Sequence, residues 1–324
     1  MVSDKKIALL GLDNAGKSSI VISMQKRFNI PKEIQGLKPT LKVSRSSFQF
    51  MDHIIYVNDF GGQENYLDMY LKDKVRYLAD IDLVFFVIDL QDSLKFNKLM
   101  EFFEEIAKFY LEFDKKVPFA VLFHKFDPKL QKDPAILKNQ ETLMEKFRPY
   151  MSKLKIRIFH TNIFNIQSII SAFSNGMKLI YSQQQVLQKF IDDIVDRMED
   201  LMALLLFEQN GIELASYLLD NVTISMQKKI IALYEIAQFR INAKNTSTFE
   251  FTDRLDQYTK VSGVIKSFEI EGLQFYVVLI VQEHDPNIVI NQFNYFETAI
   301  PDMIEALKPL LLDDEQKTAE LNPQ

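Results

Sequence analysis

The segment 11–18 has the composition of a phosphate-binding loop. It reads GLDNAGKS and fits the pattern G-x-x-x-x-G-K-[ST], between a predicted strand and a predicted helix. In such a loop the backbone N–H groups turn inward toward phosphate, the lysine reaches the β- and γ-phosphates, and the last hydroxyl ligates Mg²⁺. A Gly-containing turn that matches by chance is the alternative. The expected nucleotide contacts here are Asp13, Asn14, Ala15, Gly16, Lys17, Ser18 and Ser19.

A second group of polar and glycine residues follows the predicted strand 53–58. It reads Asp59-Phe60-Gly61-Gly62-Gln63. A carboxylate at a strand end can hold Mg²⁺ through water, Gly62 lets a backbone N–H approach the γ-phosphate, and Gln63 can orient the attacking water. An Asp before Gly-Gly is also an ordinary turn. Its place one strand pair after the phosphate loop favours the functional interpretation.

A third motif follows the predicted strand 118–123 and reads His124-Lys125-Phe126-Asp127. An aspartate can accept from the N1–H and the exocyclic amine of guanine, a donor pair that adenine lacks. The stem of Lys125 can pack over the base, and we expect His124 to hydrogen-bond near the phosphate loop. Thr161, Asn162 and Ile163 follow the last strand, where either a base-contacting loop or a plain turn is expected. Together the motifs predict binding of GTP and GDP with Mg²⁺.

The elements that must position these motifs alternate between strands and helices. Strands are expected at 7–10, 42–50, 53–58, 82–89, 118–123 and 156–160, and helices at 18–28, 99–111 and 169–181. Segment 82–89 is almost continuously apolar, as expected of a strand buried on both faces of a parallel sheet. This alternation predicts an α/β fold, a mostly parallel sheet with helices on both faces.

The second half of the chain has a different order of predicted strands and helices. Two hairpins are predicted, with strands 202–207 and 212–219 around Asn210-Gly211 and strands 263–270 and 273–281 around Glu271-Gly272. Apolar periodicity predicts helices at about 184–201, 225–242 and 300–311. An α/β domain with an antiparallel sheet is expected, in which the second and third helices cover one face and the first covers part of the other. The uncovered face or the unpaired edge would then bind a second chain.

Composition excludes several classes of protein. The 324 residues carry a formal charge of −6 without a Lys/Arg block, which argues against nucleic acid as a partner. There is no cysteine, and no apolar run approaches the roughly 20 residues of a membrane span. We expect a cytoplasmic protein without direct membrane insertion, recruited to membranes only through partners.

The first domain resembles small GTPases of the Arf and Rag branches. The Gly-Leu-Asp-x-Ala-Gly-Lys phosphate loop is similar to Arf, whereas Asp59 to Gln63 and the His at 124 are similar to Rag. By this resemblance Thr40, in Lys38-Pro39-Thr40, would ligate Mg²⁺ with Ser18 and, through water, Asp59; Ser44, Ser46 and Ser47 are rivals. Thr161 to Ile163 is similar to a Rag Thr-Ser-Ile loop, although Asn162 departs from it.

The resemblance also implies a domain organisation and a set of partners. A GTPase domain at 1–182 would precede a roadblock- or longin-like dimerisation domain at 183–313 and a polar tail at 314–324. The implied partners are a second copy or a related GTPase, with roadblock or longin scaffold proteins. No arginine besides Arg45 is a candidate to assist hydrolysis in cis, which implies activating and exchange proteins. A nucleotide-binding scaffold with negligible hydrolysis is the alternative function.

Overall fold

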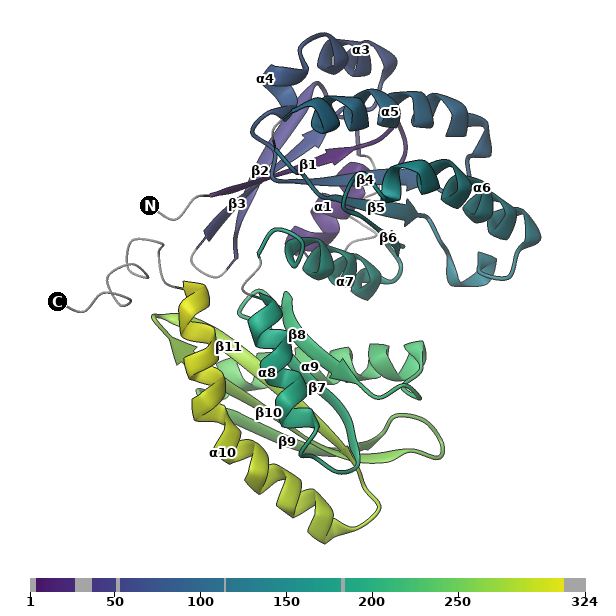
Figure 1. The fold of residues 1–324 in the computed structure, drawn as a ribbon. Coiled ribbons are helices and arrows are strands. Elements are labelled where there is room, and N and C mark those ends of the chain that lie inside the picture. The colour runs from purple at the N-terminus through teal and green to yellow at the C-terminus, as the bar shows by residue number, and fades with distance from the viewer. Residues whose placement is uncertain (1–3, 27–36, 51–52, 114, 182–183, 312–324) are drawn as a thin grey trace, which may run out of the picture. The chain divides into compact units, whose positions relative to one another are not determined.

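The computed structural model describes residues 4–26, 37–50, 53–113, 115–181 and 184–311 of the 324-residue chain. The polar tail expected at 314–324 and the end of the helix expected at 18–28 lie outside these residues. The chain divides into two compact units, one within residues 3–180 and the other formed mainly by residues 181–324 (Figure 1).

The first unit is built on a six-stranded sheet whose strands stand in the order β2-β3-β1-β4-β5-β6. Pairs β1–β3, β1–β4, β4–β5 and β5–β6 are all parallel, so the sheet is mostly parallel, as the alternation of elements predicts. Its strands are β1 (Lys5–Leu10), β2 (Val43–Phe50), β3 (His53–Phe60), β4 (Leu83–Asp89), β5 (Phe119–His124) and β6 (Ile156–His160).

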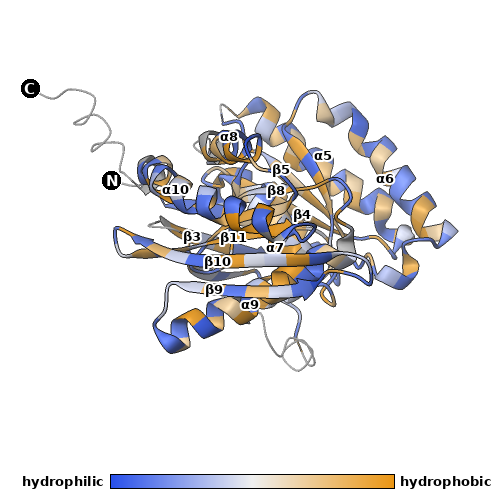
Figure 2. Ribbon diagram, turned by 90° about the horizontal axis from the view of Figure 1, so that it is seen from below, coloured by the Kyte–Doolittle hydropathy of each residue, from blue (hydrophilic) through white to orange (hydrophobic). Residues whose placement is uncertain are grey.

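Helices cover both faces of this sheet. One face packs against α3, α4, α5 and α6 through a large apolar core that includes Phe86, Phe103, Leu143 and Phe147. The opposite face packs against α1 and α7, where the rings of Phe85 and Phe173 stack with centroids 5.2 Å apart. In Figure 2, α5 and α6 carry both hydrophobic and hydrophilic segments, as amphipathic surface helices do. The helices are α1 (Lys17–Lys26), α3 (Glu64–Lys72), α4 (Lys74–Leu78), α5 (Phe96–Glu112), α6 (Pro134–Met151) and α7 (Ile166–Met177).

The second unit has a five-stranded sheet in the order β8-β7-β11-β10-β9, and every pair is antiparallel. The two predicted hairpins form, with Gly211 and Gly272 at positive φ in their turns. Edge strand β9 was not expected from the sequence. The strands are β7 (Leu201–Glu208), β8 (Glu213–Leu218), β9 (Thr248–Arg254), β10 (Lys260–Ile270) and β11 (Leu273–Gln282).

Three helices of the described residues cover this second sheet. They are distributed over its two faces differently from the prediction made from the sequence. Helix α9 (Ile224–Lys244) is the only helix of the described residues that packs on the face that holds Leu205, Ile265 and Val278. Helix α10 (Pro286–Leu311) contacts β10, β11 and α8 (Gln184–Val195), and α8 contacts β7 and β8. The terminal helix therefore lies with α8 and not with α9. Both faces are covered, so the expected bare face is wrong.

Candidate functional site

The segment between β1 and α1 curls sharply at three positions. Gly11, Asn14 and Gly16 have φ of 144°, 59° and 96°. A Cβ at Gly11 would lie 2.2 Å from the carbonyl oxygen of Val87, and one at Gly16 would lie 2.5 Å from Cδ2 of His124. Only glycine fits such close approaches at these backbone angles. The loop therefore needs its two glycines to pack against the ends of β4 and β5.

Lys17 is buried inside this loop. Its Nζ donates to the carbonyl oxygens of Gly11 and Leu12, at 2.9 and 2.7 Å. Burial lowers the pKa of the Lys17 ammonium to about 8, against the opposing attraction of Asp59 and Asp13. An ammonium held in such a desolvated position interacts strongly with any anion that enters the loop.

Three side-chain oxygens from separate segments meet beside the loop. Ser18 Oγ lies 2.8 Å from Thr40 Oγ1 and donates to Asp59 Oδ2 at 2.5 Å, while Thr40 Oγ1 donates to the same oxygen at 3.1 Å. The rival serines 44, 46 and 47 instead belong to strand β2. Burial raises the pKa of Asp59, although the bonds from Ser18 and Thr40 and the charge of Lys17 oppose this.

This oxygen cluster fits Mg²⁺ by its chemistry. All three side chains offer the hard oxygen ligands that Mg²⁺ prefers. Asp59 Oδ1 is also buried without a hydrogen-bond partner, so one acceptor is left for a further ligand such as a metal-bound water. Elsewhere among the described residues, no group of three His, Asp or Glu side chains could hold a metal ion.

The phosphate loop borders a cavity of about 300 Å³. Gly62 closes one side, since a Cβ there would lie 2.3 Å from the Asp13 backbone nitrogen. Gln63 precedes α3, and its buried Oε1 lacks a hydrogen-bond partner. The lining residues are Asp13, Asn14, Ala15, Gly16, Lys17, Ser18, Ser19, Leu37, Lys38, Pro39, Thr40, Phe60, Gly62 and Gln63.

His124 connects two loops at the end of β5. Its Nδ1 lies 2.9 Å from Thr161 Oγ1, and the other side of its ring packs on Gly16. Burial, with a smaller effect of the Lys125 charge, lowers the pKa of His124 to about 4. The imidazole is therefore neutral at pH 7 and joins the phosphate loop to the loop after β6.

The Asp127 carboxylate is held from two directions. Asn162 Nδ2 donates to Asp127 Oδ1, and Gln91 Nε2 donates to Oδ2 at 3.3 Å. The buried Asn162 also accepts from the Phe164 backbone nitrogen at 2.6 Å through Oδ1. Asn162 thus departs from the Rag pattern without losing contact with Asp127. The structure brings Thr161 and Asn162 into hydrogen-bond contact with His124 and Asp127, two of the other predicted site residues, and gives no such bond for Ile163 in the described part of the chain.

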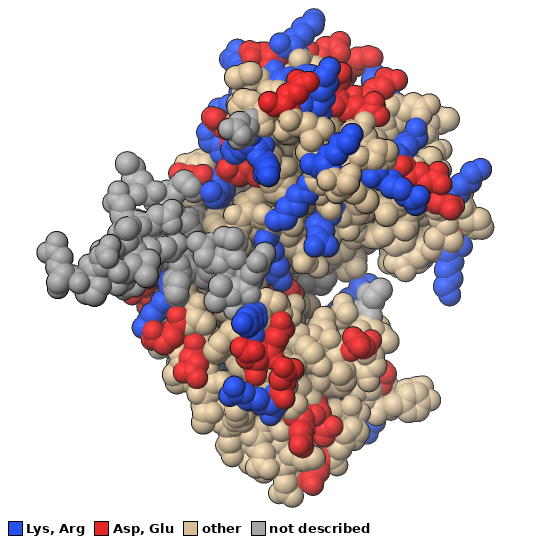
Figure 3. All heavy atoms as spheres, in the orientation of Figure 1, with Lys and Arg blue, Asp and Glu red and all other residues tan. Residues whose placement is uncertain are grey.

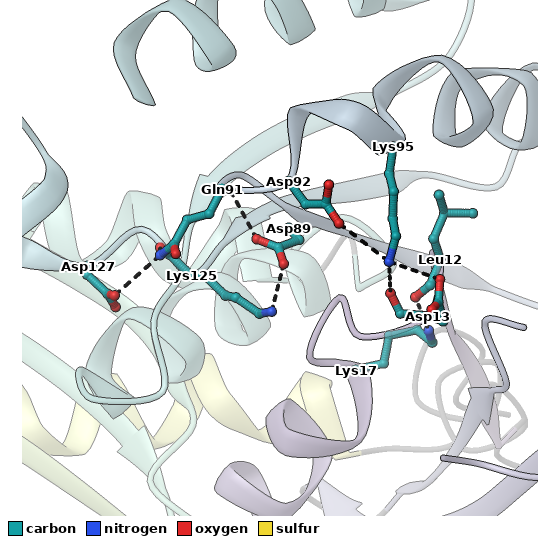
Figure 4. A network of polar contacts seen from close by, with 9 residues as sticks. All are labelled: Leu12, Asp13, Lys17, Asp89, Gln91, Asp92, Lys95, Lys125 and Asp127. Carbon is teal, nitrogen blue, oxygen red and sulfur yellow. Dashed lines mark hydrogen bonds and ion pairs between the residues drawn. The ribbon is translucent and has the colours of Figure 1, made fainter. Parts of the chain in front are cut away.

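Sequence reasoning missed the contribution of the segment after β4 (Figure 4). Asp89 Oδ2 pairs with Lys125 Nζ at 2.7 Å, and Gln91 Nε2 donates to the Lys125 carbonyl oxygen at 2.7 Å. These bonds brace Lys125, whose φ of 59° is unusual for a lysine. The Asp89 position at the end of a buried strand, the feature that also marked Asp59, was the available signal.

The segment that follows β4 also contacts the phosphate loop, through Lys95. Lys95 Nζ lies 3.2 Å from an Asp13 carboxylate oxygen and 3.4 Å from an Asp92 carboxylate oxygen. No spacing rule links Lys95 to Asp13, because 82 residues separate them.

Comparison with known proteins shows the family to which the sequence is similar. A family model described as the Gtr1/RagA G protein conserved region matches residues 6–265. ADP-ribosylation factor-like protein 3 of Caenorhabditis elegans is 31% identical over 124 residues, which cover 38% of this chain and 61% of that protein. ADP-ribosylation factor-like protein 2 of Dictyostelium discoideum is 34% identical over 87 residues, 27% of this chain and 42% of that protein.

Two further proteins are less similar to this chain in sequence. ADP-ribosylation factor-like protein 13B of Chlamydomonas reinhardtii is 29% identical over 121 residues, 37% of this chain and 21% of that protein. The chain thus spans between about a fifth and three fifths of the length of these curated relatives. The solved Arl6 BBS3 small GTPase of Trypanosoma brucei, with bound GppNp, is similar at 21% identity and a TM-score of 0.42, over 55% of this chain and 98% of that one.

Proposed function

The chain belongs to the Gtr1/RagA G-protein family, and we propose that it is a molecular switch that binds and hydrolyses GTP. The observation that carries the proposal is the meeting of Ser18, Thr40 and Asp59 beside the phosphate loop. These residues come from a helix start, a loop and a strand end. A site built this way depends on the position of the Thr40 segment, as a nucleotide-sensing switch requires.

The phosphates would bind in the cavity lined by the loop. Lys17 supplies a buried cation, and the backbone N–H groups at the start of α1 supply further donors. Mg²⁺, held by Ser18 and Thr40 and by Asp59 through water, would neutralise charge on the β- and γ-phosphates. Binding of phosphate also gives Lys17 an anionic partner in place of carbonyl oxygens.

Gln63 is the residue that we propose to orient the attacking water. Its side chain lines the cavity, and its buried Oε1 has no hydrogen-bond partner in the described structure, so an acceptor is free for a water O–H. No arginine is among the described residues that line the cavity. GTPases without such a group hydrolyse at about 10⁻⁴ s⁻¹, against about 10 s⁻¹ when one is supplied. An activating protein, and an exchange protein to release GDP, are therefore proposed as partners.

Guanine would be selected by Asp127. Its two carboxylate oxygens accept one bond each from Asn162 and Gln91, which leaves lone pairs for the N1–H and amine of the base. Lys125 would pack its stem along the base while Asp89 holds its ammonium.

A nucleotide-binding scaffold without significant hydrolysis is the second candidate function. Single-turnover phosphate release from the GTP-loaded chain separates the two, with Gln63→Leu as the matched variant. A switch releases phosphate measurably, and Gln63→Leu lowers the rate while GTP remains bound. Equal rates in the two proteins would contradict the role of Gln63, and no release over several hours would support the scaffold.

We also propose that residues 183–313 form a roadblock- or longin-like dimerisation domain after the GTPase domain of residues 1–182. Because helices cover both faces of the second sheet, the proposed contact is its edge strand β9 with the outer face of α9. Ile236 and Phe239 of α9 are 49% and 75% exposed. Arg240 lies over the ring of Phe249 in β9, which places this helix surface beside that edge.

Light scattering of the full chain tests the dimer. We expect the mass of two chains at tens of micromolar, and a shift toward one chain for Phe239→Glu but not for Leu137→Glu, an exposed leucine of the first unit. A single-chain mass for the unmutated protein would exclude the homodimer and leave a related GTPase as the partner. Roadblock or longin scaffold proteins are further proposed partners.

A cytoplasmic location is proposed as well. Within the described part of the chain no helix combines the length and apolar character that a membrane span needs. Lys and Arg side chains are interspersed with Asp and Glu over the face of the first unit in Figure 3, and the net charge is −6. This surface gives no support to nucleic-acid binding, and any recruitment to membranes would occur through partners.

A further inference from the structure

Lys95 is a charged residue at the phosphate loop that the proposed mechanism does not use. It ends the short helical turn Ser93–Lys95 between β4 and α5. Its Nζ lies 3.2 Å from Asp13 Oδ1, 3.4 Å from the Asp13 carbonyl oxygen and 3.4 Å from Asp92 Oδ2. Although burial acts in the opposite direction, the bonds and charges of Asp13 and Asp92 raise the pKa of Lys95, so it is fully protonated at neutral pH.

Asp13 is an unfavourable residue for a loop that accepts phosphate. Asp13 lines the cavity, and a Cβ added at Gly62 would lie 2.3 Å from the Asp13 backbone nitrogen and 2.3 Å from the Leu12 carbonyl carbon. Asp13 is therefore a neighbour of Gly62, the residue expected to approach the γ-phosphate, and its carboxylate acts electrostatically on the Lys17 ammonium inside the loop. Without compensation, its charge would repel a triphosphate more than a diphosphate, because the triphosphate carries the larger negative charge.

The contacts of Lys95 offset the repulsion between Asp13 and the phosphates in two ways. The ion pair cancels the charge of Asp13, and the bond to the Asp13 carbonyl oxygen fixes the backbone just before Asn14, where φ turns positive. Asp92 holds the ammonium from the other side, so the cation stays over the loop (Figure 4). The ammonium thus acts on both the charge and the curvature of the loop.

We propose that Lys95 is a positioning residue that neutralises Asp13 and thereby sets the preference of the loop for GTP over GDP. The inference rests on the proposed function, since it assumes that guanine nucleotides bind in this cavity. Lys95 acts through Asp13 and needs no contact with the nucleotide.

The test is the ratio of the GTP and GDP dissociation constants, measured on the full chain with labelled nucleotides and Mg²⁺. Lys95→Met is expected to weaken GTP binding roughly three- to tenfold more than GDP binding, the range for a partly exposed ion pair at a charged site. Lys95→Arg should keep the original ratio. Lys146→Met removes a surface lysine of α6 whose Nζ contacts Asn97, and it should also keep that ratio.

A double variant tests whether Lys95 acts on nucleotide preference through Asp13. In the Asp13→Asn background, Lys95→Met should no longer change the ratio, and Asp13→Asn alone should keep the ratio of the unmutated chain, because Lys95 already neutralises Asp13 and retains Asp92 as a partner. An unchanged ratio in Lys95→Met, or an equal loss in both backgrounds, would overturn the proposal even though the protein binds GTP. Failure of the unmutated chain to bind either nucleotide would instead overturn the proposed function, so the two failures are distinguishable.

Discussion

The side-chain amide of Asn162 donates to the carboxylate of Asp127 across 35 residues of sequence. Asn162 is buried after β6, while Asp127 lies just after β5, so the bond joins the carboxyl ends of two neighbouring strands. The carboxylate that would recognise guanine is thus oriented before a nucleotide arrives. Such preorganisation strengthens binding because less conformational freedom is lost on association.

Asn162→Ala is therefore expected to weaken guanine-nucleotide binding. Without this bond the Asp127 side chain must be ordered on binding at a cost of roughly 0.5–1.5 kcal/mol, which corresponds to about a two- to tenfold rise in the dissociation constant. Because the chain has no tryptophan, a fluorescent nucleotide is the practical reporter. Asn175→Ala is the matched control, since Asn175 is a partly buried residue of α7 whose side chain bonds to Ser171 of the same helix. Equal affinities in the two variants would contradict the role of Asn162.

Asp127→Asn should change which base is preferred. The amide presents a donor where the carboxylate had an acceptor, so it complements xanthine, which carries a carbonyl in place of the guanine amine. We expect the variant to bind xanthosine diphosphate more tightly than GDP, reversing the order in the unmutated chain. Competition with a labelled nucleotide measures both, and an unchanged preference for GDP would contradict the assignment of Asp127.

The oxygen cluster gives a prediction about magnesium. Ser18→Asn replaces a hydroxyl that contacts both Thr40 and Asp59 with a larger amide. We expect the Mg²⁺ dependence of GTP binding to weaken by an order of magnitude or more, with GDP binding less affected, because Mg²⁺ contributes more to a bound triphosphate. Ser171→Asn, at an exposed position of α7, is the control. Titration with MgCl₂ at constant nucleotide gives the comparison, and parallel curves for the two variants would contradict the metal site.

His124 gives a prediction about pH and stability. Burial lowers the pKa of His124 to about 4 in the folded protein, whereas a solvated histidine has a pKa of 6.5, so the unfolded chain binds more protons between these values. The free energy of unfolding must therefore fall as pH decreases through this window, by roughly 2 kcal/mol between pH 7 and pH 5 from this residue alone. Urea unfolding of His124→Asn at both pH values should show a smaller loss. An identical loss in the variant would show that His124 is not the cause.

The sequence predicted the strands of the first sheet well for a physical reason. Strands such as β4 and β5 are buried on both faces, so their apolar runs are continuous and end at polar residues that carry function. Helices α3, α4 and α6 were not predicted. Helix α6 mixes charged residues with few buried ones, and Pro134 and Pro149 at its two ends obscure the helical pattern.

The site residues that stand next to a strand end in the sequence were predicted. The site residues that only the fold brings together from distant segments were missed. The phosphate loop directly follows β1 and Asp59 stands at the end of β3, so spacing alone points to them. Lys95 and Gln91 act on residues 82 and 36 positions away, and only the fold brings them together. In the second unit, apolar periodicity located α10 but could not assign its face, because β11 is apolar on both sides.

A competition titration tests the central claim, that the chain recognises guanine nucleotides with Mg²⁺, most directly. The full chain is loaded with fluorescent GDP in MgCl₂, and GTP, GDP and ATP are each added as competitors. We expect GTP and GDP to displace the label at concentrations at least about a hundredfold below that of ATP, since ATP forfeits both bonds to Asp127 and each is worth roughly 1.5–3 kcal/mol. Displacement by ATP at the same concentration as GTP would contradict the account.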